Sequence, residues 1–297
     1  GNEVVCLDNF STGKRKNIEE FLSNTHFRLI EGDIRNYEDC QKAVEGMEYV
    51  FHEAALGSVP RSIKDPVTTT DVNIGGFVKM LFASKEAGVK RFIYAASSST
   101  YGDHPDLPKV EEKIGSPLSP YAITKYVNEL YASNFAKTYG IEVIGLRYFN
   151  VFGRRQDPDG AYAAVIPIFI KTLFERKSPV INGDGSVSRD FTFIDNAVQV
   201  NHLAAMASDA SVLNDVYNVA QGERTTLNTL FEKIRKKASA YDSKIAEIEP
   251  VYGPFRTGDI PHSLASIEKA RKKLGYSPTH TVDQGLSEAV EWYWNNL

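Results

Sequence analysis

The stretch Val4–Gly13 reads VVCLDNFSTG and decides how the rest of the chain is interpreted. Its first four residues are apolar, as in a short buried strand, and Asp8 closes that strand. A buried strand that ends in an acidic residue is typical of the second strand of a dinucleotide-binding βαβ unit. Such a unit opens with an earlier strand and a glycine-rich loop, and the given sequence has neither before Val4.

Working outward from this stretch, strands and helices alternate through the first half of the chain. Strand-like runs occupy residues 4–7, 27–30, 49–51, 91–96 and 143–148. Helical patterns lie between them, at about 17–24, 37–46, 66–87 and 120–139. This alternation predicts an α/β fold, a Rossmann-type doubly wound parallel sheet with right-handed crossovers. Ligand-binding residues are then expected directly after the strands, at Asp8, Asp33, Ala54–Leu56 and Ser97–Ser99.

The pattern loosens after about residue 150. Further helices are predicted at 163–175, 195–208, 226–238, 264–274 and 282–296. We therefore expect a dinucleotide-binding domain over 1–155, to which some later segments return. Residues 156–297 are expected to form mainly a smaller mixed α/β lobe for the substrate.

Composition excludes several classes of protein. The chain has 297 residues, is 42% hydrophobic and carries a net charge of -4, which gives no general attraction to nucleic acid or anionic membranes. We find no apolar run long enough to span a bilayer and no signal-peptide pattern, so a cytoplasmic protein is predicted. Cys6 and Cys40 are expected to be buried thiols, and no Cys/His cluster has metal-ligand spacing, so no metal is predicted.

The clearest chemical signal is Tyr121-Ala-Ile-Thr-Lys125. Residues four apart share one helix face, and an ammonium group there would lower the pKa of a phenol and make it a general base. The pair alone also fits an ordinary amphipathic helix. The strand RFIYAA, which ends in Ser97, Ser98 and Ser99, favours the catalytic interpretation. A serine hydroxyl and the phenol could converge on one substrate oxygen.

Ordered motifs along the whole chain resemble the extended short-chain dehydrogenase/reductase family, and within it the nucleotide-sugar 4-epimerases. They are LDNFSTG, GDIR, HEAALGSVPRS, SSSTYGD, SPYAITKY, LRYFNVFGRRQ, GAYAAVIP, INGDGSVSRDF and FRTGDIPHS. The sequences of these motifs are most similar to those of the UDP-N-acetylglucosamine 4-epimerases of bacterial surface-polysaccharide pathways.

The resemblance implies a site for NAD. It assigns cofactor contacts to Asp8, Asn9, Ser11, Thr12, Gly13, Asp33, Ile34, Ala54, Ala55, Leu56, Asn73, Tyr121, Lys125 and Phe149. A carboxylate at Asp8 disfavours the 2′-phosphate of NADP, although the cations of Lys14–Lys16 leave that alternative open. Members of the family carry a strand, a glycine turn and a helix before the equivalent of Gly1, so the sheet as given is expected to lack a central strand.

The resemblance also implies catalytic and substrate-binding residues. Ser97, Tyr121 and Lys125 match the catalytic positions. Substrate contacts are implied for Ser98, Ser99, Asn150, Val165, Ile181, Asn182, Arg189, Arg256, Asp259 and Ser263. Phe191 departs from the family, because many relatives have Tyr there.

The implied reaction inverts C4 of UDP-GlcNAc and UDP-GalNAc, with transient hydride transfer to tightly bound NAD and a 4-keto intermediate. Small Ser263 is expected to admit the N-acetyl group, while UDP-glucose, UDP-galactose and UDP-glucuronate remain alternative substrates. The absence of an acidic residue after Ser97 counts against a dehydratase. A homodimer is implied, and a non-catalytic nucleotide-binding module stays open as the rival function.

Overall fold

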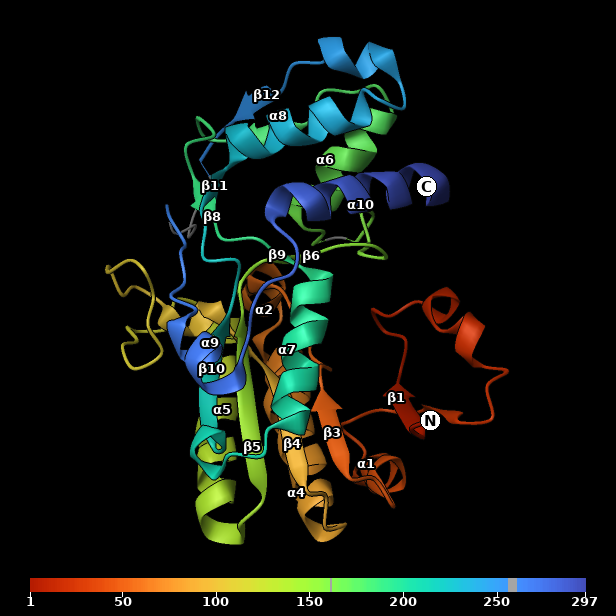
Figure 1. Ribbon diagram of the computed structural model, residues 1–297, viewed down its shortest axis with the longest axis vertical. Helices are drawn as coiled ribbons and strands as arrows, with labels where there is room; N and C mark the ends of the chain where they lie inside the picture. The colour runs from red at the N-terminus through yellow and green to blue at the C-terminus, as the bar shows by residue number, and fades with distance from the viewer. Residues whose placement is uncertain (161, 256–260) are drawn as a thin grey trace. The chain divides into compact units, whose positions relative to one another are not determined.

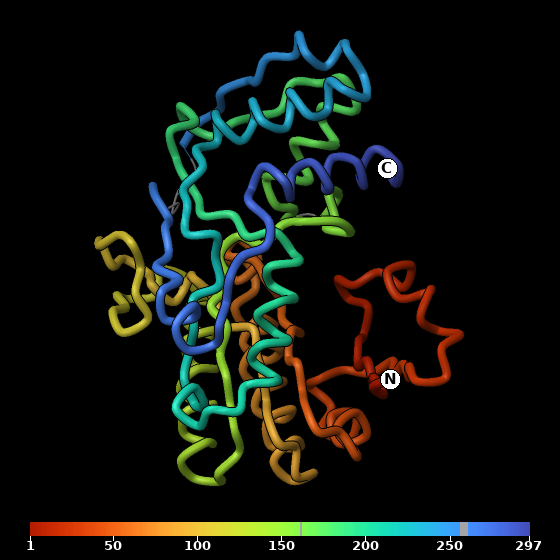
Figure 2. Tube along the Cα trace, in the orientation of Figure 1, coloured from red at the N-terminus to blue at the C-terminus, as the bar shows by residue number. Residues whose placement is uncertain are grey.

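The computed structural model describes residues 1–160, 162–255 and 261–297. The chain divides into two compact units (Figures 1 and 2). Unit 1 comprises residues 1–102, 115–147 and 204–217, and unit 2 comprises 103–114, 148–203 and 218–297. The chain thus leaves unit 1 at 103–114 and again at residue 148, and it returns at 115 and at 204–217.

Unit 1 is built from alternating strands and helices. A four-stranded sheet has the order β10-β5-β4-β3, and β3 and β4 are parallel. Its strands are β3 (Tyr49–His52), β4 (Arg91–Ser97), β5 (Glu142–Tyr148) and β10 (Asp215–Val219), the last two of which run on into unit 2. The helices of unit 1 are α1 (Tyr37–Val44), α2 (Val59–Lys64), α3 (Pro66–Thr70), α4 (Phe77–Glu86) and α5 (Pro120–Tyr139). These elements confirm the predicted α/β fold.

A second, two-stranded parallel sheet in unit 1 consists of β1 (Val4–Asp8) and β2 (Phe27–Glu31). Within the described residues β1 pairs only with β2, and β3 pairs only with β4. Val4 and Phe51, one on each of these strands, are 49% and 48% exposed. Among the residues that the structure describes, no strand therefore pairs with the second edge of β1 or of β3.

Two helical predictions need correction. Residues 17–24 do not form one helix, because only two short 3₁₀ turns occur there, at Arg15–Asn17 and Glu19–Phe21, and neither buries a residue. The helix predicted over 66–87 is interrupted by a π-helical stretch, Asp71–Gly76, between α3 and α4. Such stretches often mark functional positions, and this one contains the buried Asn73.

Unit 2 has its own core. Its helices are α6 (Val165–Phe174), most of α7 (Ile194–Met206), α8 (Leu227–Ala238), α9 (Glu268–Leu274) and α10 (Val282–Asn296). Its strands form three pairs, β6 (Val151–Phe152) with β9 (Thr192–Phe193), β7 (Val180–Asn182) with β12 (Val251–Gly253), and β8 (Ser188–Arg189) with β11 (Thr225–Thr226). The core side chains come mainly from α6, α8 and α10. No helix in the described part of the chain has the length and apolarity that a membrane span requires.

Candidate active site

The candidate catalytic residues lie at the end of β4 and the start of α5, both in unit 1. β4 is almost wholly buried and ends at Ser97, after which residues 98–101 form a 3₁₀ turn. Gly102 closes that turn with φ +53°, and a Cβ there would lie 1.9 Å from the Ser116 carbonyl oxygen, so only glycine fits. α5 begins where the Ser119 hydroxyl accepts the backbone N–H of Ala122, and a proline occupies its first turn.

Ser97 and Tyr121 are brought together as the sequence predicted. A hydrogen bond joins their side chains. The Ser97 oxygen also accepts the Ser99 hydroxyl at 2.9 Å and the Ser99 backbone N–H at 3.2 Å. With both Ser99 contacts made to its oxygen, Ser97 can donate its own hydroxyl proton to the Tyr121 oxygen.

The predicted effect of Lys125 on the pKa of Tyr121 is not seen. Burial raises the pKa of Tyr121 above its ordinary value, and the hydrogen bond from Ser97 opposes that shift. The Lys125 ammonium donates instead to the carbonyl oxygen of Ala95, at 2.8 Å. Burial lowers the pKa of Lys125 itself to about 8, and the charge of Glu53 opposes this. Burial is therefore the largest influence on the pKa of both groups.

Asn73 connects the loop after β3 with α5. Its side-chain oxygen accepts the backbone N–H of Leu56 at 2.8 Å, and its amide donates to the Leu56 carbonyl oxygen at 3.2 Å. The same amide donates to the Thr124 hydroxyl at 3.2 Å, next to Lys125. With 1% of its surface exposed, Asn73 is a positioning residue for the stretch Ala54–Leu56.

The residues expected to hold the adenosine end of NAD form a compact turn after β1. Asp8 accepts the backbone N–H of Phe10 at 2.7 Å. A Cβ on Gly13 would lie 3.0 Å from the Asp8 carboxylate, so glycine at this position allows the loop to pack closely against that carboxylate. Asn9 donates to Asp33 at 2.9 Å, which ties this turn to the end of β2. Asp8 keeps acceptor capacity for a diol, so these residues fit the cofactor.

The neighbouring cations have partners of their own. Arg15 pairs with Glu31, and its guanidinium stacks 5.2 Å from the centre of the Phe10 ring. Arg35 binds both oxygens of Asp33 and holds the pKa of that carboxyl well below its usual range. A 2′-phosphate would have to compete with these carboxylates, which favours NAD over NADP.

Unit 2 carries most of the residues expected to contact the nucleotide sugar. Asn150 donates to the Asp190 carbonyl oxygen at 2.9 Å, and Arg189 donates to the Ser188 carbonyl oxygen at 2.9 Å. Val165 is the first residue of α6, and Asn182, at the end of β7, is exposed. Ser263 is buried and donates its backbone N–H to the Ser188 carbonyl. Arg256 and Asp259 lie outside the described residues.

Two apolar residues of unit 2 belong to its core, and a third is wholly buried. Ile181 is 0% exposed among the core side chains, so only its backbone is available for the predicted uridine contact. Phe191 packs edge-to-face on Phe152, an apolar setting that suits the loss of the hydroxyl found in many relatives. Phe149 is likewise 0% exposed, and its backbone N–H donates to the Val219 carbonyl oxygen.

Asp190 is a structurally important residue that sequence reasoning did not single out. Its buried carboxylate accepts the backbone N–H groups of Gln221, Gly222 and Ala265 at 3.0 to 3.2 Å. Burial raises its pKa to about 7, against the effect of these donors. Its neighbours Arg189 and Phe191 were both named from the motif INGDGSVSRDF, so the RDF triplet was the available signal.

The comparisons with known proteins identify the family. Residues 1–220 match the sequence profile of the NAD dependent epimerase/dehydratase family, and the chain belongs to that family. A putative UDP-glucose 4-epimerase of Methanocaldococcus jannaschii is 33% identical over 296 residues, which cover 99% of this chain and 91% of that protein. The family assignment confirms NAD as the cofactor of this class of enzyme.

Two solved structures resemble the fold closely. A UDP-N-acetylglucosamine 4-epimerase from Methanobrevibacter ruminantium, in complex with UDP-N-acetylmuramic acid, superposes with a TM-score of 0.92 at 38% identity, covering 100% of this chain and 92% of that one. A mutant UDP-glucuronic acid 4-epimerase from Bacillus cereus, in complex with a UDP-sugar analogue and NAD, gives 0.88 at 29% identity, covering 99% and 92%.

Proposed function

We propose that this protein is an NAD-dependent UDP-sugar 4-epimerase. The observation that carries the proposal is the hydrogen-bonded pair Ser97 and Tyr121, with Lys125 buried one helical turn beyond Tyr121. Relatives with 33% and 38% identity over nearly the whole chain are described as 4-epimerases of UDP-sugars. The rival function, a non-catalytic nucleotide-binding module, would not need this set of proton-transfer groups.

The residues have separate roles in the proposed reaction. Tyr121 takes the proton of the sugar 4-hydroxyl and later returns it, and Ser97 directs its hydroxyl proton to the shared oxygen. Lys125 provides positive charge one turn along α5 and positions the cofactor ribose. Bound NAD supplies the acceptor that takes the C4 hydrogen with its electron pair and gives it back. Asp8, Asp33 and the loop 54–56 hold the cofactor, and Asn150 and Arg189 hold the diphosphate.

The turn after Ser97 favours epimerisation over dehydration. A dehydratase needs an acid close to the catalytic hydroxyl in order to protonate the leaving 6-hydroxyl. Ser98, Ser99 and Thr100 follow Ser97, and none of them is acidic. These residues supply no such acid, so water elimination is not expected.

We propose UDP-GlcNAc and UDP-GalNAc as the preferred pair of substrates. Ser263 has a small side chain and is 5% exposed, so it would leave room beside the 2-substituent of the sugar. The 38% identical relative is described as a UDP-N-acetylglucosamine 4-epimerase. UDP-glucose and UDP-glucuronate are the competing substrates, because other relatives carry those names.

The proposed function also suggests an oligomeric state and a cellular location for the protein. We propose a homodimer that pairs through α5, because Ile123, Leu130 and Tyr131 on that helix are 49%, 52% and 40% exposed. Large apolar side chains exposed at this spacing form a stripe suited to helix pairing. A cytoplasmic place in surface-polysaccharide biosynthesis would fit the proposed substrates.

Replacing the general base tests the proposed function. Wild-type protein and Tyr121→Phe are incubated with UDP-GlcNAc, UDP-glucose and UDP-glucuronate, and inversion at C4 is followed by NMR. We expect the wild type to convert UDP-GlcNAc fastest and Tyr121→Phe to lose about 10²- to 10⁴-fold in rate, the usual contribution of general acid–base catalysis. Near-wild-type turnover by the variant would remove Tyr121 from the mechanism.

A further inference from the structure

Three potential metal ligands converge in unit 2, away from the residues assigned to catalysis. Asp195 lies in the first turn of α7, His280 in the loop before α10, and Glu288 within α10. One ligand atom from each lies within 4.8 Å of the others. Asp195 is far from the other two along the sequence, and for this reason no ligand-spacing motif is visible in the printed chain.

Buried contacts fix the orientation of His280. Asn196, which is 0% exposed, accepts the backbone N–H groups of Thr279 and His280 at 2.8 and 3.1 Å and donates to the His280 carbonyl oxygen at 2.8 Å. The imidazole also packs 5.0 Å from the ring of Phe193, centre to centre. Asn196, at the start of α7, therefore holds the backbone at His280, and Phe193 packs against its ring.

The hydrogen bonds of Thr279 are compatible with an imidazole whose Nε2 is available for a metal ion. Its hydroxyl lies 3.2 Å from the Asn196 side-chain oxygen, to which it donates, and 2.9 Å from Nδ1 of His280. In the Nδ1–H tautomer the Thr279 oxygen accepts from the ring, as in the supporting contacts that orient metal-binding histidines. In that tautomer the neutral ring presents the Nε2 lone pair 3.1 Å from Glu288 Oε1. A metal ion bound by both atoms would take the place of the Nε2 proton that otherwise joins them.

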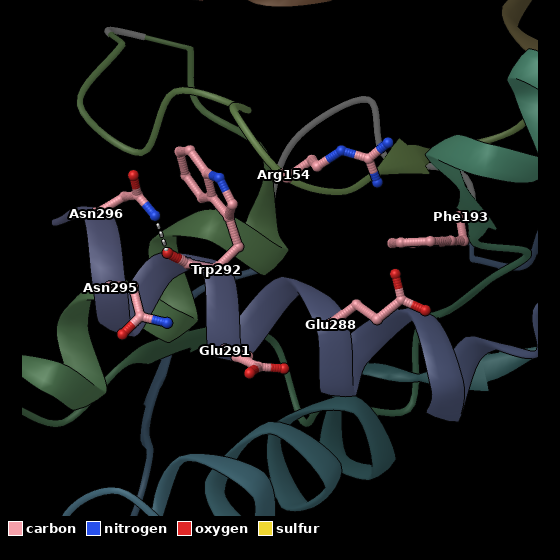
Figure 3. A pocket seen from close by; sticks show the side chains of 7 residues that line it. All are labelled: Arg154, Phe193, Glu288, Glu291, Trp292, Asn295 and Asn296. Carbon is pink, nitrogen blue, oxygen red and sulfur yellow. Dashed lines mark hydrogen bonds between the residues drawn. The ribbon is translucent and has the colours of Figure 1, made fainter.

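The surroundings favour a cation that can enter from solvent. The side chains of Asp195, His280 and Glu288 are 32%, 24% and 49% exposed. Glu288 also lines a cavity of about 300 Å³ (Figure 3). The other lining residues are Arg154, Phe193, Glu291, Trp292, Asn295 and Asn296. The Arg154 guanidinium pairs with Asp195 at 3.0 Å, and the two carboxylates of Asp195 and Glu288 together outnumber it.

We propose that Asp195, His280 and Glu288 form a binding site for a divalent first-row transition metal, with Zn²⁺ as the expected occupant. One imidazole and two carboxylates are a donor set that suits such ions, and that discriminates against Mg²⁺, which prefers oxygen ligands alone. Solvent in the adjoining cavity completes the coordination. The Arg154 guanidinium competes with the metal for Asp195 and lowers its affinity.

Titration with Zn²⁺, Co²⁺ and Mg²⁺ tests the site without reference to epimerase activity. We expect one equivalent of Zn²⁺ to bind at micromolar concentration by calorimetry, Co²⁺ to give visible absorption bands from bound metal, and Mg²⁺ to give no heat. His280→Gln and Glu288→Gln should each weaken Zn²⁺ binding about 10- to 100-fold. Glu291→Gln, a matched change of a carboxylate that lines the same cavity, should leave the affinity unchanged.

Arg154→Gln gives an expectation of opposite sign. It removes the competing cation, so it should tighten Zn²⁺ binding several-fold. The proposal is overturned if Zn²⁺ does not bind at micromolar concentration, or if His280→Gln and Glu288→Gln bind it as well as the wild type does. The cluster would then be an imidazolium–carboxylate pair. If circular dichroism shows that His280→Gln is unfolded, the exposed position Glu288 decides the outcome by itself.

Discussion

At the scale of single residues, the direction of one hydroxyl proton organises the proposed catalytic centre. Ser99 donates both its hydroxyl and its backbone N–H to Ser97, which leaves Ser97 as the donor toward Tyr121. A phenol that accepts this hydrogen bond is stabilised in its ionised form, which partly offsets the cost of burying the charge. Ser99 therefore acts as a positioning residue through Ser97, whether or not it also touches the sugar.

The buried Ser263 provides a prediction about substrate choice. Ser263→Tyr adds a large side chain where the N-acetyl group is proposed to fit, so conversion of UDP-GlcNAc should fall at least tenfold relative to UDP-glucose. One pocket contact of this size typically changes discrimination by about 10- to 200-fold. Rates with both substrates, measured by NMR, give the ratio. Ser263→Ala is the matched control and should keep the wild-type preference; an equal loss for both sugars in Ser263→Tyr would contradict the assignment.

The burial of His52, the last residue of β3, leads us to expect that the stability of unit 1 depends on pH. Its ring is 5% exposed and packs against Phe77 and Phe92, and this burial lowers its pKa to about 3. The unfolded chain binds a proton here below about pH 6.5 while the folded chain does not, so stability falls as the pH drops from 6.5 toward 3. The slope from this group approaches about 1.4 kcal/mol per pH unit inside that window.

Urea unfolding at pH 5 and pH 7 measures this dependence. The difference between the two free energies of unfolding should shrink in His52→Leu, because the variant has no group to protonate on unfolding. His202→Gln changes an exposed histidine and should keep the full difference. The same pH difference in His52→Leu as in the wild type would show that His52 is not the group responsible.

Sequence patterns singled out the proposed catalytic side chains but did not predict their pKa values or their hydrogen-bond partners. The end of a strand and a four-residue helical spacing placed Ser97, Tyr121 and Lys125, and both follow from local geometry. The attachment of Lys125 to Ala95 and the role of Asn73 depend on partners distant in sequence, such as Thr124. No local pattern encodes such pairs, and the burial that raises the pKa of Tyr121 is equally a property of the folded chain.

At the scale of elements, the two faces of α5 differ: one is buried in unit 1 and the other is exposed. One face buries Ala122, Lys125 and Asn128 inside unit 1. The other exposes Ile123, Leu130 and Tyr131, at spacings of seven and eight residues that keep them on one side of the helix. The helix that carries the proposed base, Tyr121, therefore also carries the exposed apolar stripe. Pairing through this stripe would place the dimer interface on the same helix as the proposed base.

Disruption of this stripe should separate the proposed dimer. Sedimentation equilibrium of the wild type is expected to give twice the chain mass. Ile123→Glu combined with Leu130→Glu should give a monomer, because two carboxylates per chain would be buried without partners. Val198→Glu on α7 changes a residue of similar exposure, 58%, and should leave the dimer intact. A wild-type monomer at micromolar concentration would rule out the proposed pairing.

The elements that could be predicted are those whose buried residues form a regular apolar pattern in the sequence. β3, β4, β5 and α5 fall where the apolar runs and the helical spacing placed them. The helix predicted at 17–24 failed because its apolar residues Phe21 and Leu22 are 41% and 43% exposed. A short helix without a surface to pack against is marginal in water, so the chain forms 3₁₀ turns instead. The π-helical stretch around Asn73 had no signal in the pattern.

At the scale of the whole molecule, the residues proposed to bind the two nucleotides are divided between the two units. Asp8, Asp33 and the loop held by Asn73 belong to unit 1, and Asn150 and Arg189 belong to unit 2. Each unit has a separate hydrophobic core. A ligand that binds only the folded form stabilises it by an amount set by concentration and affinity. Each nucleotide should therefore stabilise the protein through its own set of residues.

Thermal unfolding with NAD alone and with UDP alone tests this division. At one hundred times its dissociation constant each nucleotide contributes about 2.7 kcal/mol, which corresponds to a rise in Tm of about 4 °C for a protein of this size. Asp8→Asn should reduce the rise with NAD, because an amide is a poorer partner for two ribose hydroxyls, and should keep the rise with UDP. Arg189→Gln should reduce the rise with UDP, through loss of a charged phosphate contact, and keep the rise with NAD.

The crossed design makes each variant the control for the other. A variant that merely weakens the fold lowers the unliganded Tm but leaves both increments in place, since the increments depend on binding to the folded form. Loss of both increments in both variants would mean that neither residue acts through its own nucleotide. A wild type stabilised by UDP but not by NAD would support the non-catalytic module instead, because epimerisation at C4 requires the hydride acceptor as well as the sugar nucleotide.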